Sequence, residues 1–349
     1  MKALFLTIDP GGAAFLAPII RGMEAQGWRT ETWSRGLGAE RFQQEEIPAK
    51  LLPTWDQPPE GWLRSSAASL LMTSASSLPW VDFSERWAWR AGNQCSIPCI
   101  AFVDSWQNYR LRFSGCGPGE DLAFLPDLIG CPDALARREM EACGFPAGRL
   151  RAWGHPGLDQ TVRNFRPGDR TRFWWKEPER RACFQILFVS EAITEHFGRS
   201  RGYDQSDCFQ ELARWLENCS APVNLLIKLH PKESRTLHLP YFQTVARHHR
   251  VVTLEGTSPL DALGLADLVV GMTSMLLIEA NAVGKPVISL QPGLRGEDPL
   301  VLSRHHYVEV VERMPDLDGC RRITGQIFPR LPFAWDGFLA ELQSLTASA

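Results

Sequence analysis

Short apolar runs alternate with helix-like segments along this chain, and the alternation occurs in two series. The first series opens with an apolar run at residues 2–8, a Pro-Gly-Gly turn, an amphipathic segment at 13–26 and a second apolar run at 29–33. A strand–helix–strand order of this kind favours a parallel sheet, because the chain must cross over the sheet between parallel neighbours. The sequence therefore predicts an α/β fold.

A charged segment at residues 166–182, RPGDRTRFWWKEPERRA, separates the two series. It contains proline and glycine and has no long apolar period, which is typical of an interdomain linker. We therefore predict a Rossmann-like domain at 1–165, a second one at 183–332 and a final helix at 333–349. A chain of 349 residues is long enough for two cores. Ligands of such sheets bind at the carboxyl ends of the strands.

The composition restricts the class of partner and the compartment. The net charge of -3 gives no basic excess for neutralising phosphates, so nucleic acid is not an expected partner. The nine cysteines lack the paired CxxC spacing of a zinc site, so we expect reduced thiols and no metal. No apolar stretch approaches the roughly 20 residues of a membrane span. We expect a cytoplasmic protein, and peripheral docking on a membrane remains compatible with this sequence.

The first candidate site lies in residues 266–293, ADLVVGMTSMLLIEANAVGKPVISLQPG. We predict a strand, a turn containing Thr273 and Ser274, and a helix that begins at Met275. The start of such a helix presents free N–H groups and a positive dipole end, which suit a phosphate. Ser274 is either a phosphate ligand or the helix N-cap. Glu279 either reaches a ribose hydroxyl pair or is a solvated residue of a capped core helix.

The second candidate site is NLLIKLHPKE at residues 224–233. The predicted strand includes Lys228 and ends just before His230, Pro231 and Lys232. Pro231 restricts His230 to an extended backbone and so fixes the direction of the imidazole. His230 and Lys232 can then donate hydrogen bonds to a diphosphate, although a structural hydrogen bond is the alternative role for this histidine.

The third candidate site is in the N-terminal half. Asp9 follows the first predicted strand and Asp104 follows a later one, so each is a candidate general base and, alternatively, a helix N-cap. Gly11 and Gly12 would let the backbone approach a ligand closely. His155 lies in a turn that closes this half, where it either faces the ligand or packs.

These motifs resemble the GT-B glycosyltransferase superfamily, in particular bacterial surface-polysaccharide enzymes and the fold-sharing UDP-N-acetylglucosamine 2-epimerases. Residues 144–159 resemble the turn before the interdomain linker, and residues 228–233 are similar to the His-Pro motif of transferases with CMP- or CDP-activated donors. Residues 266–288 are similar to the donor-binding strand–turn–helix. The resemblance implies that His230 and Ser274 contact donor phosphates and that Glu279 contacts the ribose. Residues 188–204 resemble the loop that meets the nucleotide, which adds Ser190 and Glu191.

The sequence also departs from these families. The epimerases carry Gly-Gly after the serine of the donor motif, where this chain has Met275 and Leu276. The acidic motif that supplies the base in CMP-sialic acid transferases has no copy in the N-terminal half. The candidates for the base are therefore the two carboxylates that follow predicted strands, Asp104 first and Asp9 second.

The resemblance implies a GT-B fold with two Rossmann-like domains facing a cleft and a C-terminal helix that packs back on the N-terminal domain. It implies a metal-independent glycosyltransferase without a cofactor, active in polysaccharide biosynthesis. The donor would be a CMP/CDP- or UDP-linked nucleotide sugar, and the acceptor a sugar or small molecule. The alternatives are a nucleotide-sugar 2-epimerase or hydrolase and a non-catalytic nucleotide-sugar-binding module.

Overall fold

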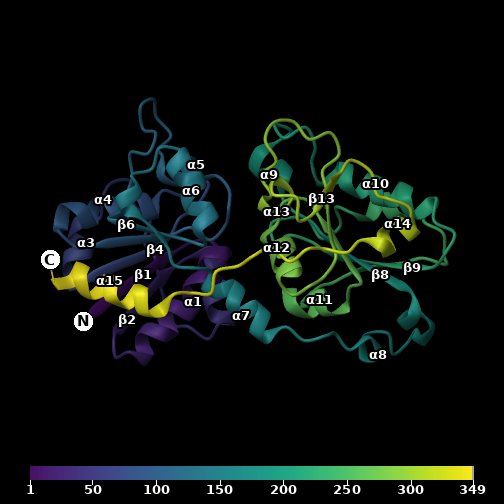
Figure 1. Ribbon diagram of the computed structural model, residues 1–349, viewed down its shortest axis with the longest axis horizontal. Coiled ribbons are helices and arrows are strands. Elements are labelled where there is room, and N and C mark those ends of the chain that lie inside the picture. Colours follow the sequence, from purple (N-terminus) through teal and green to yellow (C-terminus); the bar gives the residue numbers. More distant parts are fainter. Residues whose placement is uncertain (348–349) are drawn as a thin grey trace. The chain divides into compact units, whose positions relative to one another are not determined.

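The computed structural model describes residues 1–347, which form two compact units (Figure 1). The first unit combines Met1–Gln160 with the chain from Arg330 onward, and the second is Thr161–Pro329. Each unit contains one fully parallel sheet with helices, so the predicted α/β fold with two Rossmann-like halves is confirmed. None of the helices in residues 1–347 combines the length and the apolar character that crossing a membrane requires.

The first sheet has seven strands in the order β3-β2-β1-β4-β5-β6-β7. Their bounds are β1 Lys2–Thr7, β2 Arg29–Ser34, β3 Ala49–Leu51, β4 Leu70–Ser74, β5 Cys99–Phe102, β6 Leu128–Cys131 and β7 Leu150–Ala152. The strand order reverses between β1 and β4. This switch point is where open α/β sheets bind ligands.

The helical segments of the first unit are α1 Pro10–Ala25, α2 Gly36–Gln44, α3 Glu60–Ser65, α4 Ser84–Cys95, α5 Tyr109–Phe113, α6 Ala134–Ala142, the 3₁₀ turn η1 Ala147–Arg149, α7 Pro156–Asn164, which continues into the second unit, and α15 Trp335–Ala347. Two of these helices, α1 and α15, lie close to the segments predicted at 13–26 and 333–349. Helix α1 begins earlier than predicted because Pro10 has a backbone preset for the first turn. Strand β6 begins at Leu128, after Pro126, which has no N–H for a sheet ladder.

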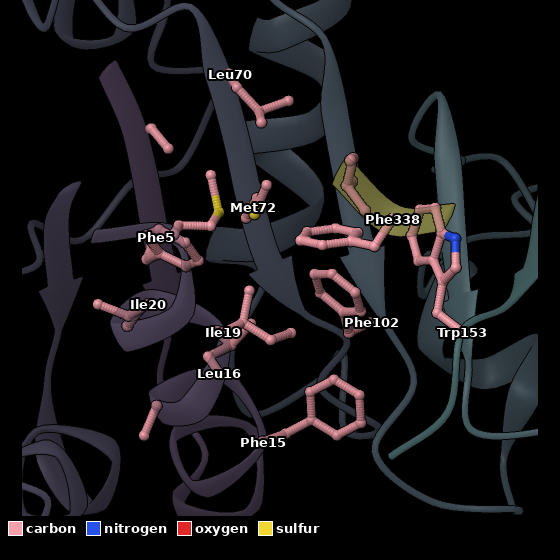
Figure 2. Packing of buried hydrophobic residues seen from close by; sticks show 14 of the residues in the cluster. Phe5, Phe15, Leu16, Ile19, Ile20, Leu70, Met72, Phe102, Trp153 and Phe338 are labelled. Carbon is pink, nitrogen blue, oxygen red and sulfur yellow. The ribbon is translucent and has the colours of Figure 1, made fainter. Parts of the chain in front are cut away.

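Helix α15 completes the core of the first unit. Phe338 and Leu342 are fully buried in the same apolar cluster as Phe5, Leu16 and Phe102. Figure 2 shows Phe338 beside Phe102 and Trp153, and its ring centroid lies 5.9 Å from that of Phe102 and 5.1 Å from that of Trp153. The predicted return of the C-terminal helix to the N-terminal half is therefore confirmed.

The second sheet has six strands in the order β10-β9-β8-β11-β12-β13, with its switch point between β8 and β11. The strands are β8 Phe184–Val189, β9 Val223–Lys228, β10 Arg250–Thr253, β11 Leu268–Gly271, β12 Val287–Leu290 and β13 Glu309–Val311. The helical segments are α8 Arg170–Phe173, η2 Pro178–Ala182, α9 Ile193–Phe197, α10 Gln205–Glu217, η3 Leu239–Phe242, α11 Pro259–Leu265, α12 Met275–Ala282, α13 Val301–Arg304 and α14 Leu317–Arg322.

Residues 166–182, the segment with linker character, contact the second unit at several points. The Gly168 N–H donates to the Gly264 carbonyl at 2.9 Å, and Arg170 pairs with Asp267 at 2.6 Å. Trp174 is 4% exposed. These residues are thus an ordered, packed part of the second unit.

Candidate functional site

The loops that follow β8 and β11 are joined by one carboxylate. Glu191 Oε1 accepts the Thr273 N–H at 2.5 Å, and Oε2 accepts the Thr273 hydroxyl at 2.8 Å. Burial raises the pKa of Glu191, while these two hydrogen bonds oppose the rise. The two loops border the switch point of the second sheet, the general ligand-binding position of open α/β sheets, and Glu191 holds them together there.

Ser274 caps helix α12. Its hydroxyl accepts the N–H of Leu276 at 3.2 Å, so of the two roles predicted for Ser274 the structure shows the capping one. Met275 is the first helical residue and Glu279 lies one turn further, and both are half-buried. The positive end of the α12 dipole therefore lies at the carboxyl end of β11.

The turn after β9 is closed by Glu233, a residue to which the sequence assigned no role. Glu233 is 7% exposed, and its two carboxylate oxygens accept the Ser190 hydroxyl at 2.7 Å and the His230 N–H at 2.6 Å. The turn carrying His230 is thereby tied to the end of β8. Lys228 lies just before this turn and donates to the Thr257 carbonyl at 2.8 Å.

Four basic side chains gather at these strand ends, and we call them the basic cluster: His196, Arg201, His230 and Lys232. The Lys232 ammonium is 3.1 Å from His196 Nε2, and the rings of His196 and His230 are 5.9 Å apart. Arg201 donates to the Thr273 hydroxyl at 3.1 Å. Pro231 is exposed within the same turn. The predicted residues His230, Lys232 and Thr273 thus belong to one neighbourhood, and His196 is an addition.

The basic cluster is electrostatically suited to an anion. Burial, followed by repulsion from His196 and Lys232, lowers the pKa of His230 to about 4. Burial and repulsion from Lys232 also lower the pKa of His196. Since His230 Nδ1 accepts the Lys232 N–H at 3.2 Å, the neutral ring carries its proton on Nε2. A bound phosphate would relieve the repulsion and accept from these donors.

In the first unit, Asp104 at the end of β5 is held in place. Its Oδ1 pairs with Arg112 at 2.9 Å, and a Cβ at Gly11 would lie 2.7 Å from its Oδ2, so a side chain at Gly11 would displace this carboxylate. Both ring nitrogens of buried His155 form hydrogen bonds to the backbone. Nε2 lies 3.0 Å from the Asp104 carbonyl oxygen, and Nδ1 accepts the Leu158 N–H at 2.9 Å. Of the two roles predicted for His155, the structure therefore shows packing.

Glu85 is a buried carboxylate at the first switch point that the sequence did not single out. It is 1% exposed and accepts the Ser74 hydroxyl at 2.5 Å, and Ser74 in turn contacts the Thr7 hydroxyl at 2.5 Å. Burial, together with the charge of Asp9, raises its pKa to about 7. Asp9 occupies the N-cap position of α1 without capping it through its side chain.

A side chain at Gly12 would collide with Ser74 and Thr7, which explains the second glycine of the pair. Residues 1–347 contain no group of three or more His, Cys, Asp or Glu side chains placed to hold a metal ion.

No protein-family model matches the sequence, and a search of curated proteins finds no match. Solved structures are similar in fold. The UDP-GlcNAc 2-epimerase of Methanocaldococcus jannaschii, in complex with UDP-GlcNAc and UDP, has a TM-score of 0.65 at 12% identity over 99% of each chain. HepE of Anabaena with UDP-glucose has a TM-score of 0.61 at 14% identity, covering 99% of this chain and 92% of its own.

MurG of Acinetobacter baumannii has a TM-score of 0.54 at 11% identity, again covering 99% of this chain and 92% of its own. Together with the two parallel sheets, these similarities show that the chain has the GT-B fold.

Proposed function

We propose that this protein is a glycosyltransferase that uses a nucleotide-activated sugar, with the donor diphosphate bound at the strand ends of the second unit. The observation that carries the proposal is the basic cluster beside the N-terminus of α12. A nucleotide diphosphate is negatively charged and would therefore neutralise the positive charge of this cluster. The uridine ligands of the structurally similar enzymes support UDP as the nucleotide, with CMP or CDP as the alternative.

The same groups can assist the departure of the nucleotide. His230, Lys232 and the dipole of α12 stabilise negative charge that develops on the leaving phosphate, in the manner of preorganised donors elsewhere. Glu279 would hold the ribose. Charge stabilisation then comes from protein groups, so the proposed reaction needs no metal.

Asp104 would accept the proton of the acceptor, with Asp9 as the second candidate. The ion pair of Asp104 with Arg112 fixes the direction of the Asp104 carboxylate. In this proposal residues 1–165 bind the acceptor, residues 183–332 bind the donor, and the segment 166–182, which packs on the second unit, connects the two. The acceptor is a sugar or small molecule of a polysaccharide pathway.

An epimerase or hydrolase on the same fold is the second candidate, because the M. jannaschii epimerase matches over 99% of both chains. Met275 and Leu276, at the positions where the resemblance expects Gly-Gly, count against it. A non-catalytic module that binds a nucleotide sugar is the third candidate.

One assay distinguishes the three. The full chain is incubated with UDP-, CDP- and CMP-sugars, with and without a mixture of saccharide acceptors, and nucleotide release and sugar products are quantified by chromatography and mass spectrometry. The proposal predicts nucleotide release that depends on the acceptor. An isomeric nucleotide sugar formed without acceptor identifies an epimerase, release to water a hydrolase, and binding without any turnover the module.

A further inference from the structure

A cavity of about 500 Å³ lies on the first unit, in the segment that leads from the edge strand β3 into α3. Two indole rings share its lining with carboxylates and amides. These six residues are Trp55, Asp56, Gln57, Glu60, Trp62 and Gln94. None of them belongs to the site described above, and the combination of flat apolar rings with paired donors and acceptors is characteristic of a ligand pocket.

The aromatic part of the cavity is fixed by packing. The rings of Trp55 and Trp62 have centroids 4.9 Å apart at an angle of 55°, and both side chains are partly exposed. Trp62 also packs edge-on against Trp33, at 5.3 Å and 83°. The Lys50 ammonium lies over the Trp33 ring, 5.2 Å from its centroid. Trp62 is thus held between two other indoles.

The start of the loop and one pair of polar side chains are held as well. Arg35, which follows β2, donates to the Pro53 carbonyl at 2.7 Å and also pairs with Asp82. The Gln94 amide nitrogen donates to Glu60 Oε1 at 3.0 Å in the amide orientation that satisfies both groups. These contacts fix the start of the loop and the Glu60–Gln94 pair, while Asp56 and Gln57 are exposed to solvent.

We infer that this pocket binds a saccharide. A sugar ring has an apolar C–H face that packs on an indole, and its hydroxyls both donate and accept hydrogen bonds. Asp56 and Glu60 accept, while the amides of Gln57 and Gln94 can do both. Tryptophan supplies this apolar contact at a low cost in conformational entropy.

A quaternary ammonium ion is the other ligand class that aromatic rings recognise. Such an ion neither donates nor accepts hydrogen bonds, so it would leave the exposed Gln57 amide to water, whereas a sugar hydroxyl can pair with it. The lining therefore favours a sugar. That this sugar is part of the acceptor rests on the proposed transferase function, whereas its binding does not.

The test uses the full chain on an array of immobilised mono- and oligosaccharides, followed by calorimetric titration of the strongest binder. Trp55→Ala is expected to weaken binding by about tenfold or more, because the stacking surface is lost. Trp175→Ala, which removes a 67% exposed tryptophan of the second unit, is the matched control and should bind as the wild type does. Gln57→Ala leaves both rings in place and should weaken binding several-fold even if Trp55→Ala fails to fold.

UDP is titrated into the same proteins in parallel. Saccharide binding that depends on Trp55 and Gln57 supports the inference whether or not UDP binds. If the wild type binds the saccharide but does not bind UDP, that result counts against the proposed function and not against the pocket. Absence of saccharide binding, or binding that neither substitution changes, overturns the inference. Binding of choline that Trp55→Ala abolishes also overturns it and makes the pocket a cation site.

Discussion

The ammonium nitrogen of Lys232 and Nε2 of His196 lie 3.1 Å apart, although the residues are 36 positions apart in the sequence. Two basic groups can share a hydrogen bond at this distance only if the imidazole accepts, so His196 is neutral there. The lowered pKa of His196 agrees with a neutral ring. This contact concentrates positive potential at the strand ends of the second unit, where an anionic ligand would be stabilised.

The affinity for a nucleotide sugar should depend on pH through these histidines. His196 and His230 have lowered pKa values in the free protein, and a bound diphosphate would raise them, so binding takes up protons and strengthens as the pH falls. We expect UDP-N-acetylglucosamine to bind several-fold more tightly at pH 5.5 than at pH 8. The double variant His196→Ala/His230→Ala should show a nearly flat profile in calorimetric titrations. An equally steep profile in that variant would assign the effect to other groups.

Substitutions of Ser274 separate capping from ligand binding. Ser274→Ala should cost about 1 kcal/mol of stability because the cap is lost. Ser274→Asp keeps a capping oxygen but places a negative charge at the phosphate position. It should therefore leave the unfolding midpoint nearly unchanged and weaken UDP binding by about 1–3 kcal/mol.

The control for the capping loss is Ser258→Ala, which removes the N-cap of α11. It should lower stability in the same way and leave UDP binding intact. UDP binding to Ser274→Asp at the wild-type affinity would place the phosphate elsewhere.

Glu85 should make stability fall as the pH rises. Its folded-state pKa of about 7 lies above the ordinary value of 4.5, so between these values the native state binds more protons than the unfolded state. Stability from this group is complete below pH 4.5 and is lost as the pH passes 7. Glu85→Gln does not titrate, so its free energy of unfolding relative to the wild type should rise by about 2–3 kcal/mol between pH 5 and pH 8.

Urea denaturation at both pH values measures this difference. Glu217→Gln, at an exposed position, should show no such change. A relative stability of Glu85→Gln that is the same at pH 5 and pH 8 would mean that Glu85 is ionised throughout.

Asp104→Asn tests the proposed base. The variant should bind UDP as the wild type does and lose sugar transfer, because the amide cannot take a proton from the acceptor. It should also lose about 1–3 kcal/mol of stability, since the Arg112 side chain is only 6% exposed and would lack its carboxylate. Asp121→Asn, in an exposed pair with Arg110, is the control for the stability effect. Sugar transfer by Asp104→Asn at the wild-type rate would make Asp9 the next residue to test.

The positions of the strand-end motifs could be predicted from the sequence because they depend on local patterns. A β-branched apolar run followed by a hydroxyl residue and a helical period locates Ser274, and a proline fixes His230 at the end of β9. A helical period of apolar residues likewise predicts α15, and its apolar face explains its burial. These features need no knowledge of distant contacts.

The remaining parts of the site depend on contacts across the fold. His196 meets Lys232 only because β8 and β9 are neighbours in the sheet. Glu85 lies in a tryptophan-rich stretch and becomes a buried group through Ser74 on a different element. The sequence makes His155 equally suited to a ligand or to packing, and only its hydrogen bonds to two backbone groups distinguish the two roles. No local pattern distinguishes such residues from ordinary surface or core positions.

Calorimetric titration of UDP and CDP into the full chain measures whether the basic cluster binds a nucleotide diphosphate. We predict one site per chain, with a Kd that rises by about tenfold in His196→Ala and in His230→Ala. The unfolding midpoints of both variants should match that of His248→Ala, a histidine outside the cluster. If neither nucleotide bound the wild type, or if both cluster variants bound as tightly as the wild type, the basic cluster would not be a nucleotide site.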